Sequence, residues 1–121
     1  MEWIMDKKRP ICPQLSERLC ILIASGECGA GERLMSVREV ALKAGVNPNT
    51  VQKSFEQLEQ KGVIYSKRGS GWYVSDDIHI ARDVMNEMVQ SKTDAYIGDM
   101  RSLGLGNEQI ISIVKEELCD E

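Results

Sequence analysis

The stretch of sequence that decides the fold is residues 36–62, SVREVALKAGVNPNTVQKSFEQLEQKG. Its first part carries a start and a stop signal for a helix. Ser36 and Glu39 have the spacing of a capping box, in which the serine side chain accepts from the glutamate N–H and the glutamate side chain reaches back. Gly45 suits the left-handed residue that follows a helix. These signals predict a helix over 37–44.

A second helix is predicted almost at once. Asn47 is a favourable N-cap, and Pro48 suits the first helical position, where its missing N–H costs nothing. Apolar residues at i, i+4 and i+7 from Val51 give this helix an inward face as far as about Lys61. Two helices joined by a turn of about three residues that contains a glycine form a helix-turn-helix.

The flanking sequence extends this unit on both sides. Apolar residues at helical spacing predict an earlier helix over about 14–25, and glycines make residues 29–31 a loop. After the helix pair, β-formers at 63–67 and 72–74 flank the glycine-rich segment 68–71, which predicts a hairpin. Three helices followed by a hairpin describe a winged helix-turn-helix, a mainly α fold with a small β-hairpin.

Two more helices are predicted, over about 78–103 and 107–118. Each has a broad apolar stripe that two helices alone cannot bury, so we expect a second copy of the chain to cover it. The predicted organisation is a DNA-binding domain over 1–75 and a helical dimerisation domain over 76–121. The residues expected to form the homodimer are Met85, Met88, Val89, Tyr96, Met100, Leu103, Ile110, Ile111 and Val114.

The charge distribution supports this division. The whole chain of 121 residues has a formal net charge of −4, which is unusual for a DNA-binding protein. Residues 1–75, however, hold eleven Lys and Arg against eight Asp and Glu, and residues 76–121 hold four against eleven. The first part can approach a polyphosphate, and the second would be repelled by it.

The outward face of the second helix of the pair suits DNA. In a helix-turn-helix, the N-terminal part of this helix enters the major groove, where amides and hydroxyls reach base edges. Arg38, in the first turn of the preceding helix, is placed to touch the backbone or a base, and the glycines of the hairpin let the chain approach the sugar-phosphate wall. The expected DNA-binding residues are Ser36, Arg38, Asn47, Pro48, Asn49, Thr50, Gln52, Lys53, Lys67, Arg68, Gly69 and Gly71.

Catalytic and metal chemistry find little support in the sequence. The four cysteines include no close pair of the kind that zinc sites use, and His79 is the only histidine. We expect no enzyme activity, no metal and no cofactor, and Cys20 is expected to be a small core residue. No apolar run reaches the roughly 18 residues that a membrane span needs, so a cytoplasmic protein without membrane contact is expected.

Residues 10–74 resemble the DNA-binding domain of the GntR family of bacterial regulators. The resemblance rests on PICPQL at 10–15, GERLMSVR at 31–38, VNPNTV at 46–51, LEQKG at 58–62 and RGSGWYV at 68–74. Met35 stands where the family usually has proline, and Cys12 stands where an aromatic residue is frequent. The family implies DNA contacts from Arg38, Asn49, Thr50 and Arg68-Gly69. The short two-helix tail is similar to that of the YtrA-like subfamily, in which it implies dimerisation.

The resulting hypothesis is a repressor that binds double-stranded DNA, at a near-palindromic, inverted-repeat operator, as a homodimer. The sequence shows no convincing effector pocket, so three modes of control stay open: partner proteins, an unidentified hydrophobic small-molecule effector between the tails, and autoregulation alone. The alternative is a winged helix used for protein–protein assembly without specific DNA binding, since fold alone does not fix function.

Overall fold

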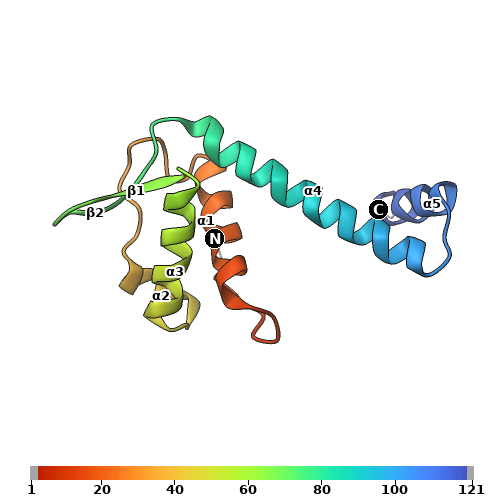
Figure 1. Ribbon diagram of the computed structural model, residues 1–121, viewed down its shortest axis with the longest axis horizontal. Coiled ribbons are helices and arrows are strands. Elements are labelled where there is room, and N and C mark those ends of the chain that lie inside the picture. Colours follow the sequence, from red (N-terminus) through yellow and green to blue (C-terminus); the bar gives the residue numbers. More distant parts are fainter. Residues whose placement is uncertain (1–2, 120–121) are drawn as a thin grey trace. The chain divides into compact units, whose positions relative to one another are not determined.

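The computed structural model describes residues 3–119 and consists of five helices and one two-stranded antiparallel sheet within that range (Figure 1). The elements are α1 (Ile11–Ala24), α2 (Val37–Ala44), α3 (Pro48–Gln60), β1 (Ile64–Lys67), β2 (Gly71–Val74), α4 (Ile78–Ser102) and α5 (Asn107–Leu118). The chain divides into two compact units, of which the first ends at Asn86 and the second begins at Glu87. The predicted class, mainly α with a small hairpin, is confirmed.

Helix α1 begins earlier than the sequence predicts. The prediction started it at Gln14, after both prolines, whereas the helix begins at Ile11 with Pro10 as its N-cap residue. Pro13 is therefore the third residue of the helix. The first N–H groups of a helix have no partner within it, so a proline there removes no hydrogen bond.

The helix-turn-helix forms as the capping signals predict. Helix α2 starts after Ser36 and ends at Gly45, whose φ of 65° is left-handed. Helix α3 starts at Pro48 and ends one residue short of Lys61. Val46 and Asn47 alone separate Gly45 from the start of α3, so the two helices meet across a short turn.

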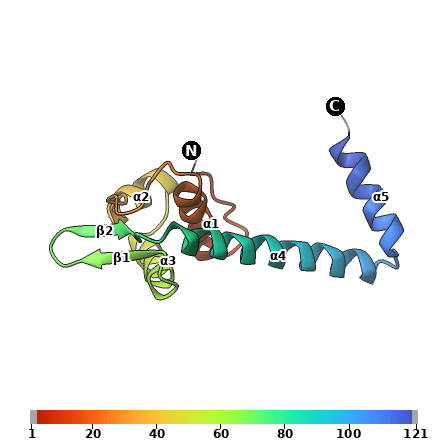
Figure 2. The ribbon, with the colours of Figure 1, turned by 90° about the horizontal axis from the view of Figure 1, so that it is seen from above.

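The hairpin of β1 and β2 pairs in antiparallel register, with Ile64 opposite Val74 and Lys67 opposite Gly71, and projects from the helices of the first unit (Figure 2). Residues 31–34, which the sequence predicts only as a loop, form hydrogen bonds with β2 of this hairpin. The Gly31 N–H donates to the Val74 carbonyl at 2.9 Å, and the Leu34 N–H donates to the Trp72 carbonyl at 2.8 Å. Residues 31–34 thus anchor the start of the helix pair to β2.

The core of the first unit lies between the three helices and the hairpin. Phe55 is fully buried, and its ring meets Trp72 edge to face at 5.4 Å between centroids. Such aromatic pairs add to the stabilisation from burial itself. Cys20 is fully buried in this core, as predicted. Other buried members are Leu15, Leu19, Leu34, Val40, Val51, Leu58, Ile64 and Val74.

The first unit includes the beginning of α4. Ala81 and Val84 are buried, and the Ile80 side chain lies against Gly62, at the end of α3. The first compact unit therefore runs to Asn86, within α4, because these apolar side chains pack on the winged helix. The functional division expected at residue 75 stays a prediction. Within the second unit, a loop connects the end of α4 to α5.

Candidate nucleic-acid interface

The N-terminus of α2 is fixed by a complete capping box. The Ser36 hydroxyl accepts from the Glu39 N–H at 3.1 Å, and the Glu39 carboxylate accepts from the Ser36 N–H at 3.2 Å. This reciprocal arrangement satisfies two backbone groups that would otherwise lack partners. Arg38 lies in the first turn that the box orders, and its side chain is exposed. The sequence thus builds a rigid backbone beneath a free guanidinium.

The N-terminus of α3 is capped in a similar way. The Asn47 carboxamide oxygen accepts from the Asn49 N–H at 2.8 Å. The side chains of Asn49 and Lys53 are exposed, and those of Thr50 and Gln52 are half-buried. An amide, a hydroxyl and an ammonium therefore line the outward face of the first turns. These groups match base-edge and phosphate chemistry in a major groove.

Helix α3 is braced against α1 by a buried polar contact. The hydroxyls of Ser16 and Ser54 are 2.7 Å apart, and Ser54 also lies 3.3 Å from the Cys12 carbonyl. Ser54 is fully buried and Ser16 nearly so. A buried hydroxyl without a partner is costly, so these bonds favour one relative placement of the two helices. Helix α3 is thereby held in one position against α1.

The hairpin has an ordered outer surface. The rings of Tyr65 and Tyr73 stack with centroids 5.9 Å apart, and the Lys67 ammonium lies 4.5 Å from the Tyr73 centroid. Cation–π attraction favours this position for Lys67. The hydroxyls of Ser70 and Tyr73 are hydrogen-bonded across the tip. These contacts stiffen the strands that carry Arg68, which is exposed at the tip beside Gly69.

Two contacts fix the hairpin on α3. The Glu59 carboxylate accepts from the Ser66 N–H at 3.3 Å and from the Ser66 hydroxyl at 3.1 Å. The second contact is the ring pair of Phe55 and Trp72 described above. Arg68 at the hairpin tip and the outward residues of α3 therefore belong to one rigid assembly. The structure brings the two groups of expected DNA-binding residues together in this way.

Two basic residues near this surface were not among the expected DNA-binding residues. The Arg33 guanidinium lies beside Gly71, where an added Cβ would come within 3.2 Å of its Nε. Arg33 bridges to Tyr73 through the backbone. The Lys7 ammonium donates to the Gly45 carbonyl at 3.0 Å. Neither contact can be predicted from hydrophobic periodicity in the sequence. Only the positive charge of Arg33 and Lys7 could have suggested these two residues as DNA-binding candidates.

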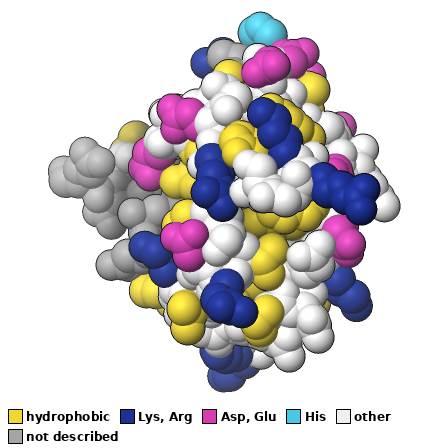
Figure 3. All heavy atoms as spheres, turned by 90° about the vertical axis from the view of Figure 1, so that its left-hand side faces the viewer, with side chains coloured by type: hydrophobic (Ala, Val, Ile, Leu, Met, Phe, Trp, Pro, Cys, Tyr) yellow, Lys and Arg dark blue, Asp and Glu magenta, His cyan; other side chains and the backbone are white. Residues whose placement is uncertain are grey.

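The charge on this side of the molecule suits a polyanion. Figure 3 looks onto the side from which the hairpin projects, and Lys and Arg side chains are spread over the middle and lower parts of this face, with Asp and Glu side chains among them. No group of His, Cys, Asp and Glu that could hold a metal ion occurs within residues 3–119. Among the same residues, no helix is both long and apolar enough to cross a membrane. The arrangement offers hydrogen bonds and positive charge, which serve binding.

The expected dimerisation residues lie mostly on the surface of the second unit. Val89, Leu103 and Ile111 are more than half exposed, Tyr96 and Val114 are 37% exposed, and Ile110 is buried. Met85, which lies in the first unit, is half-buried, as are Met88 and Met100. The described chain leaves this apolar surface largely uncovered.

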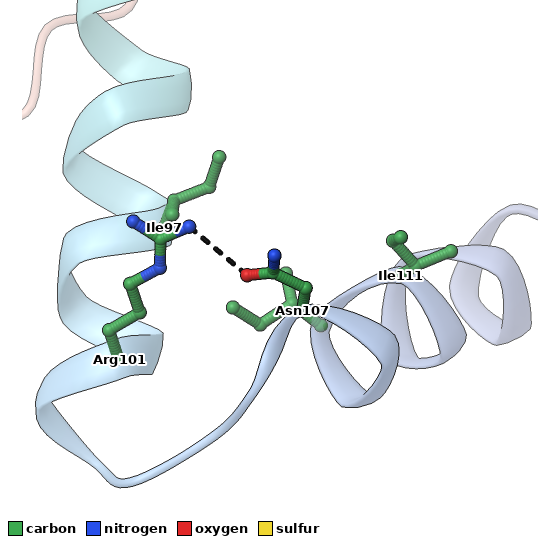
Figure 4. A pocket seen from close by; sticks show the side chains of 5 residues that line it. Ile97, Arg101, Asn107 and Ile111 are labelled. Carbon is green, nitrogen blue, oxygen red and sulfur yellow. Dashed lines mark hydrogen bonds between the residues drawn. The ribbon is translucent and has the colours of Figure 1, made fainter.

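A pocket of about 220 Å³ lies between the end of α4 and α5 within the second unit (Figure 4). Three isoleucines and the side chains of Arg101 and Asn107 line it. Arg101 Nη2 donates to Asn107 Oδ1 at 3.1 Å across its mouth, which ties the two helices together. The lining is mainly apolar and comes from Ile97, Ile110 and Ile111.

A capped helix pair, in which the second helix has an exposed outward face, together with a flanking hairpin defines the class of winged helix-turn-helix DNA-binding domains. Residues 13–74 match the model of the family described as bacterial regulatory proteins, gntR family. This match covers half of the chain. The chain therefore belongs to the GntR family of transcriptional regulators.

Relatives that span the whole chain agree with this assignment. The HTH-type transcriptional repressor YtrA of Bacillus subtilis is 32% identical over 115 residues, covering 92% of this chain and 86% of that protein. The transcriptional regulator YhcF of the same organism is 27% identical over 110 residues, 91% of each chain. A GntR family transcriptional regulator from Listeria monocytogenes has 36% identity and a TM-score of 0.81, over 93% of this chain and 98% of that one. The similarity thus includes the two-helix tail.

Proposed function

We propose that this regulator is a repressor that binds a near-palindromic DNA operator as a homodimer. The observation that carries the proposal is the group of exposed side chains, Arg38, Asn49, Lys53 and Arg68, on elements that buried contacts hold in one assembly. Preorganised donors lose little entropy on binding, which favours specific recognition. The name of the Bacillus subtilis relative, a transcriptional repressor, supports the direction of regulation.

We propose that α2, α3 and the hairpin divide the work of recognition. The exposed ends of Asn49 and Lys53, together with Thr50 and Gln52, read base edges in the major groove. Arg38 and the capped N-termini contact phosphates, and Arg68 enters the adjacent minor groove from the hairpin tip. Ser36 and Asn47 act mainly through their caps, because each uses its side-chain oxygen to order the helix that follows.

The homodimer rests on the apolar surface of the second unit. Leu103 is 74% exposed and Val89 is 58% exposed, and several large apolar side chains left exposed on one small unit favour an interaction site. A second copy presents the same surface, which is what a two-fold interface requires. Two reading heads related by a two-fold axis then demand an inverted repeat in the DNA.

The pocket between α4 and α5 fits this interface better than it fits an effector. Its volume of about 220 Å³ is below the roughly 300 Å³ at which small-molecule sites begin. Its apolar lining and its place beside exposed Ile111 suit an inserted side chain. We propose that an apolar residue of the second copy occupies it.

Selection from random DNA duplexes by the purified full-length protein tests the proposal. We expect recovery of an inverted repeat, with an affinity that falls steeply as salt is raised because phosphate contacts release counterions. Sedimentation of the free protein should show a dimer. Recovery of nothing above background, with an intact dimer, would favour the winged helix as a protein–protein module. A flat salt response would contradict binding in a DNA groove.

A further inference from the structure

The segment before α1 is an ordered loop, although it lies outside the region that matches the family model. The Gln14 carboxamide bonds to its backbone in both directions: Oε1 accepts from the Asp6 N–H at 2.8 Å, and Nε2 donates to the Asp6 carbonyl at 2.8 Å and the Pro10 carbonyl at 3.0 Å. Met5 is buried beside it in the sequence. The loop Asp6–Arg9 is therefore held at both ends.

The Asp6 carboxylate organises the inside of this loop. It accepts from the Lys8 N–H at 3.0 Å and from the Arg9 guanidinium at 3.0 Å. Both donors favour the ionised form, first the Lys8 N–H and then Arg9, so the pKa of Asp6 lies below its usual value. The charge of Arg9 is thereby matched within the loop, and the charges of Lys7 and Lys8 are left to act outside it.

The loop is joined to the turn of the helix-turn-helix. The Lys7 ammonium donates to the Gly45 carbonyl at 3.0 Å, across 38 positions of sequence. Gly45 ends α2 and lies two residues before Asn47, the N-cap of the reading helix α3. The loop and the α2–α3 turn accordingly lie at the same end of the first unit (Figure 1).

The two lysines retain the capacity to bind an anion. An ammonium has three donors, so Lys7 can hold Gly45 and still donate to a second acceptor. Lys8 is exposed, and its ammonium makes no hydrogen bond or ion pair with the described residues. Two adjacent cations on an ordered backbone form a phosphate site, since little freedom is lost when the anion arrives.

The anion that we expect at these lysines is a DNA backbone phosphate, because the loop lies beside the N-terminus of α3. A major groove is about 12 Å wide and is bordered on both sides by sugar-phosphate backbone. When the N-terminus of α3 lies in the groove, a loop bonded to the turn just before α3 lies near one of these borders. More than half of the hydrogen bonds in protein–DNA complexes go to the backbone, where they set the position of the protein.

We propose that the loop Asp6–Arg9 is a third DNA-contacting element, in which Lys7 and Lys8 bind a backbone phosphate beside the groove that α3 reads. The proposal rests on the DNA binding proposed above. It adds contacts that set affinity and register and leave base preference to α3. The loop also couples the turn to α1, because Lys7 bonds to Gly45 and the Gln14 side chain of α1 bonds to the loop backbone.

The test compares Lys8→Gln with Lys61→Gln in the full-length protein on the selected duplex. Both variants remove one exposed positive charge, but Lys61 lies at the far end of the 13-residue α3, about 20 Å from its start. The slope of log affinity against log salt is negative. For Lys8→Gln we expect this slope to become shallower by about 0.9 for each loop that contacts the DNA. Affinity should fall by a similar factor on all sequences, so the preference for the operator stays unchanged.

A second variant separates placement from charge. Gln14→Ala keeps the net charge but removes the bonds that order the loop, and we expect it to lower the salt slope as Lys8→Gln does, with helix content checked by circular dichroism. A Lys8→Gln slope equal to that of Lys61→Gln would overturn the proposal. A Gln14→Ala slope at the wild-type value would overturn the role of the ordered loop. Failure of the wild-type protein to select any duplex would instead contradict the proposed function.

Discussion

At the scale of single residues, the interface combines free side chains with a fixed backbone. Arg38 illustrates this: its side chain is exposed, whereas the backbone that carries it is ordered by Ser36 and Glu39 on either side. We expect substitution of such a residue to weaken DNA binding and to leave the fold intact. Substitution of Ser54 would instead affect the fold, because its buried hydroxyl is hydrogen-bonded to the Ser16 hydroxyl.

Arg38→Ala is expected to weaken operator binding by about 1–3 kcal/mol, because a charge-assisted contact to DNA is lost. Thermal unfolding should remain unchanged, since the side chain makes no hydrogen bond to the described residues. Fluorescence anisotropy with labelled operator measures the affinity. Arg38→Lys is the matched control and should retain part of the binding, because it keeps the charge and loses the planar fork. An unchanged affinity for Arg38→Ala would remove it from the interface.

Cys20 and Cys119 are expected to differ in reactivity. Burial raises the pKa of the Cys20 thiol to about 11, and Cys119 is exposed. The thiolate is the reactive form, so Cys20 stays protonated and inert at neutral pH. Iodoacetamide at pH 8 followed by mass spectrometry should modify Cys119 in the native protein and Cys20 only after denaturation. Rapid native labelling of Cys20 would show that the core opens locally.

The raised pKa of Cys20 also predicts how stability depends on pH. The folded protein favours the neutral thiol, so this contribution is complete below the ordinary thiol pKa and is lost as pH rises through the folded value of about 11. Cys20→Ala removes this dependence, and the difference in unfolding free energy between the two proteins should shrink in that alkaline range.

At the scale of elements, the sequence was most informative where signals act over a few residues. The capping box at Ser36 and the N-cap at Asn47 each bond a residue two or three positions away, so their spacing alone places α2 and α3. The start of α1 was predicted three residues late because Pro10 and Pro13 were expected to bracket the entry to the helix, although prolines are tolerated in a first turn.

Contacts between distant residues could not be predicted in this way. The bond from Lys7 to Gly45 spans 38 positions, as does the bond between Ser16 and Ser54. Residues 31–34 pair with β2 although Gly29 and Gly31 indicate a loop. Such pairings depend on the packed fold, and no local periodicity encodes them. The positions expected to contact DNA were derived from the helix pair and the hairpin, which is why the N-terminal loop and Arg33 were not among them.

Asn47 and Asn49 lie in the same turn, but we expect Asn47 to stabilise α3 and Asn49 to bind DNA. Asn47→Ala removes the cap of α3 and should lower the free energy of unfolding by about 1 kcal/mol. Asn49→Ala leaves the cap intact, because Asn49 takes part through its backbone N–H, and should weaken DNA binding without loss of stability. Urea unfolding and DNA titration of both variants separate the effects. Equal stability of the two variants would show that the cap contributes nothing.

At the scale of the whole molecule, the two compact units differ in charge and in surface. The first unit, residues 1–86, holds twelve Lys and Arg against eleven Asp and Glu, whereas the second unit, residues 87–121, holds three against eight. The exposed apolar residues of the second unit include Val89, Leu103, Ile111 and Leu118. A strongly acidic segment gains nothing from approaching DNA, so its apolar surface has a protein as its natural partner. We therefore propose that the first unit reads DNA and that the second unit pairs two copies of the chain.

Truncation after Asn86 tests this division and preserves the fold of the first unit, because Ala81 and Val84 remain to cover its core. The truncated protein should sediment as a monomer and keep its helical circular dichroism spectrum. Its affinity for the inverted repeat should fall by about 100-fold or more, because the second half-site is no longer bound at the high effective concentration that a dimer provides. Affinity for a single half-site should change little, which is the internal control. A dimer that survived truncation would place the pairing surface in the first unit, and the exposed apolar side chains of α4 and α5 would then need a different partner.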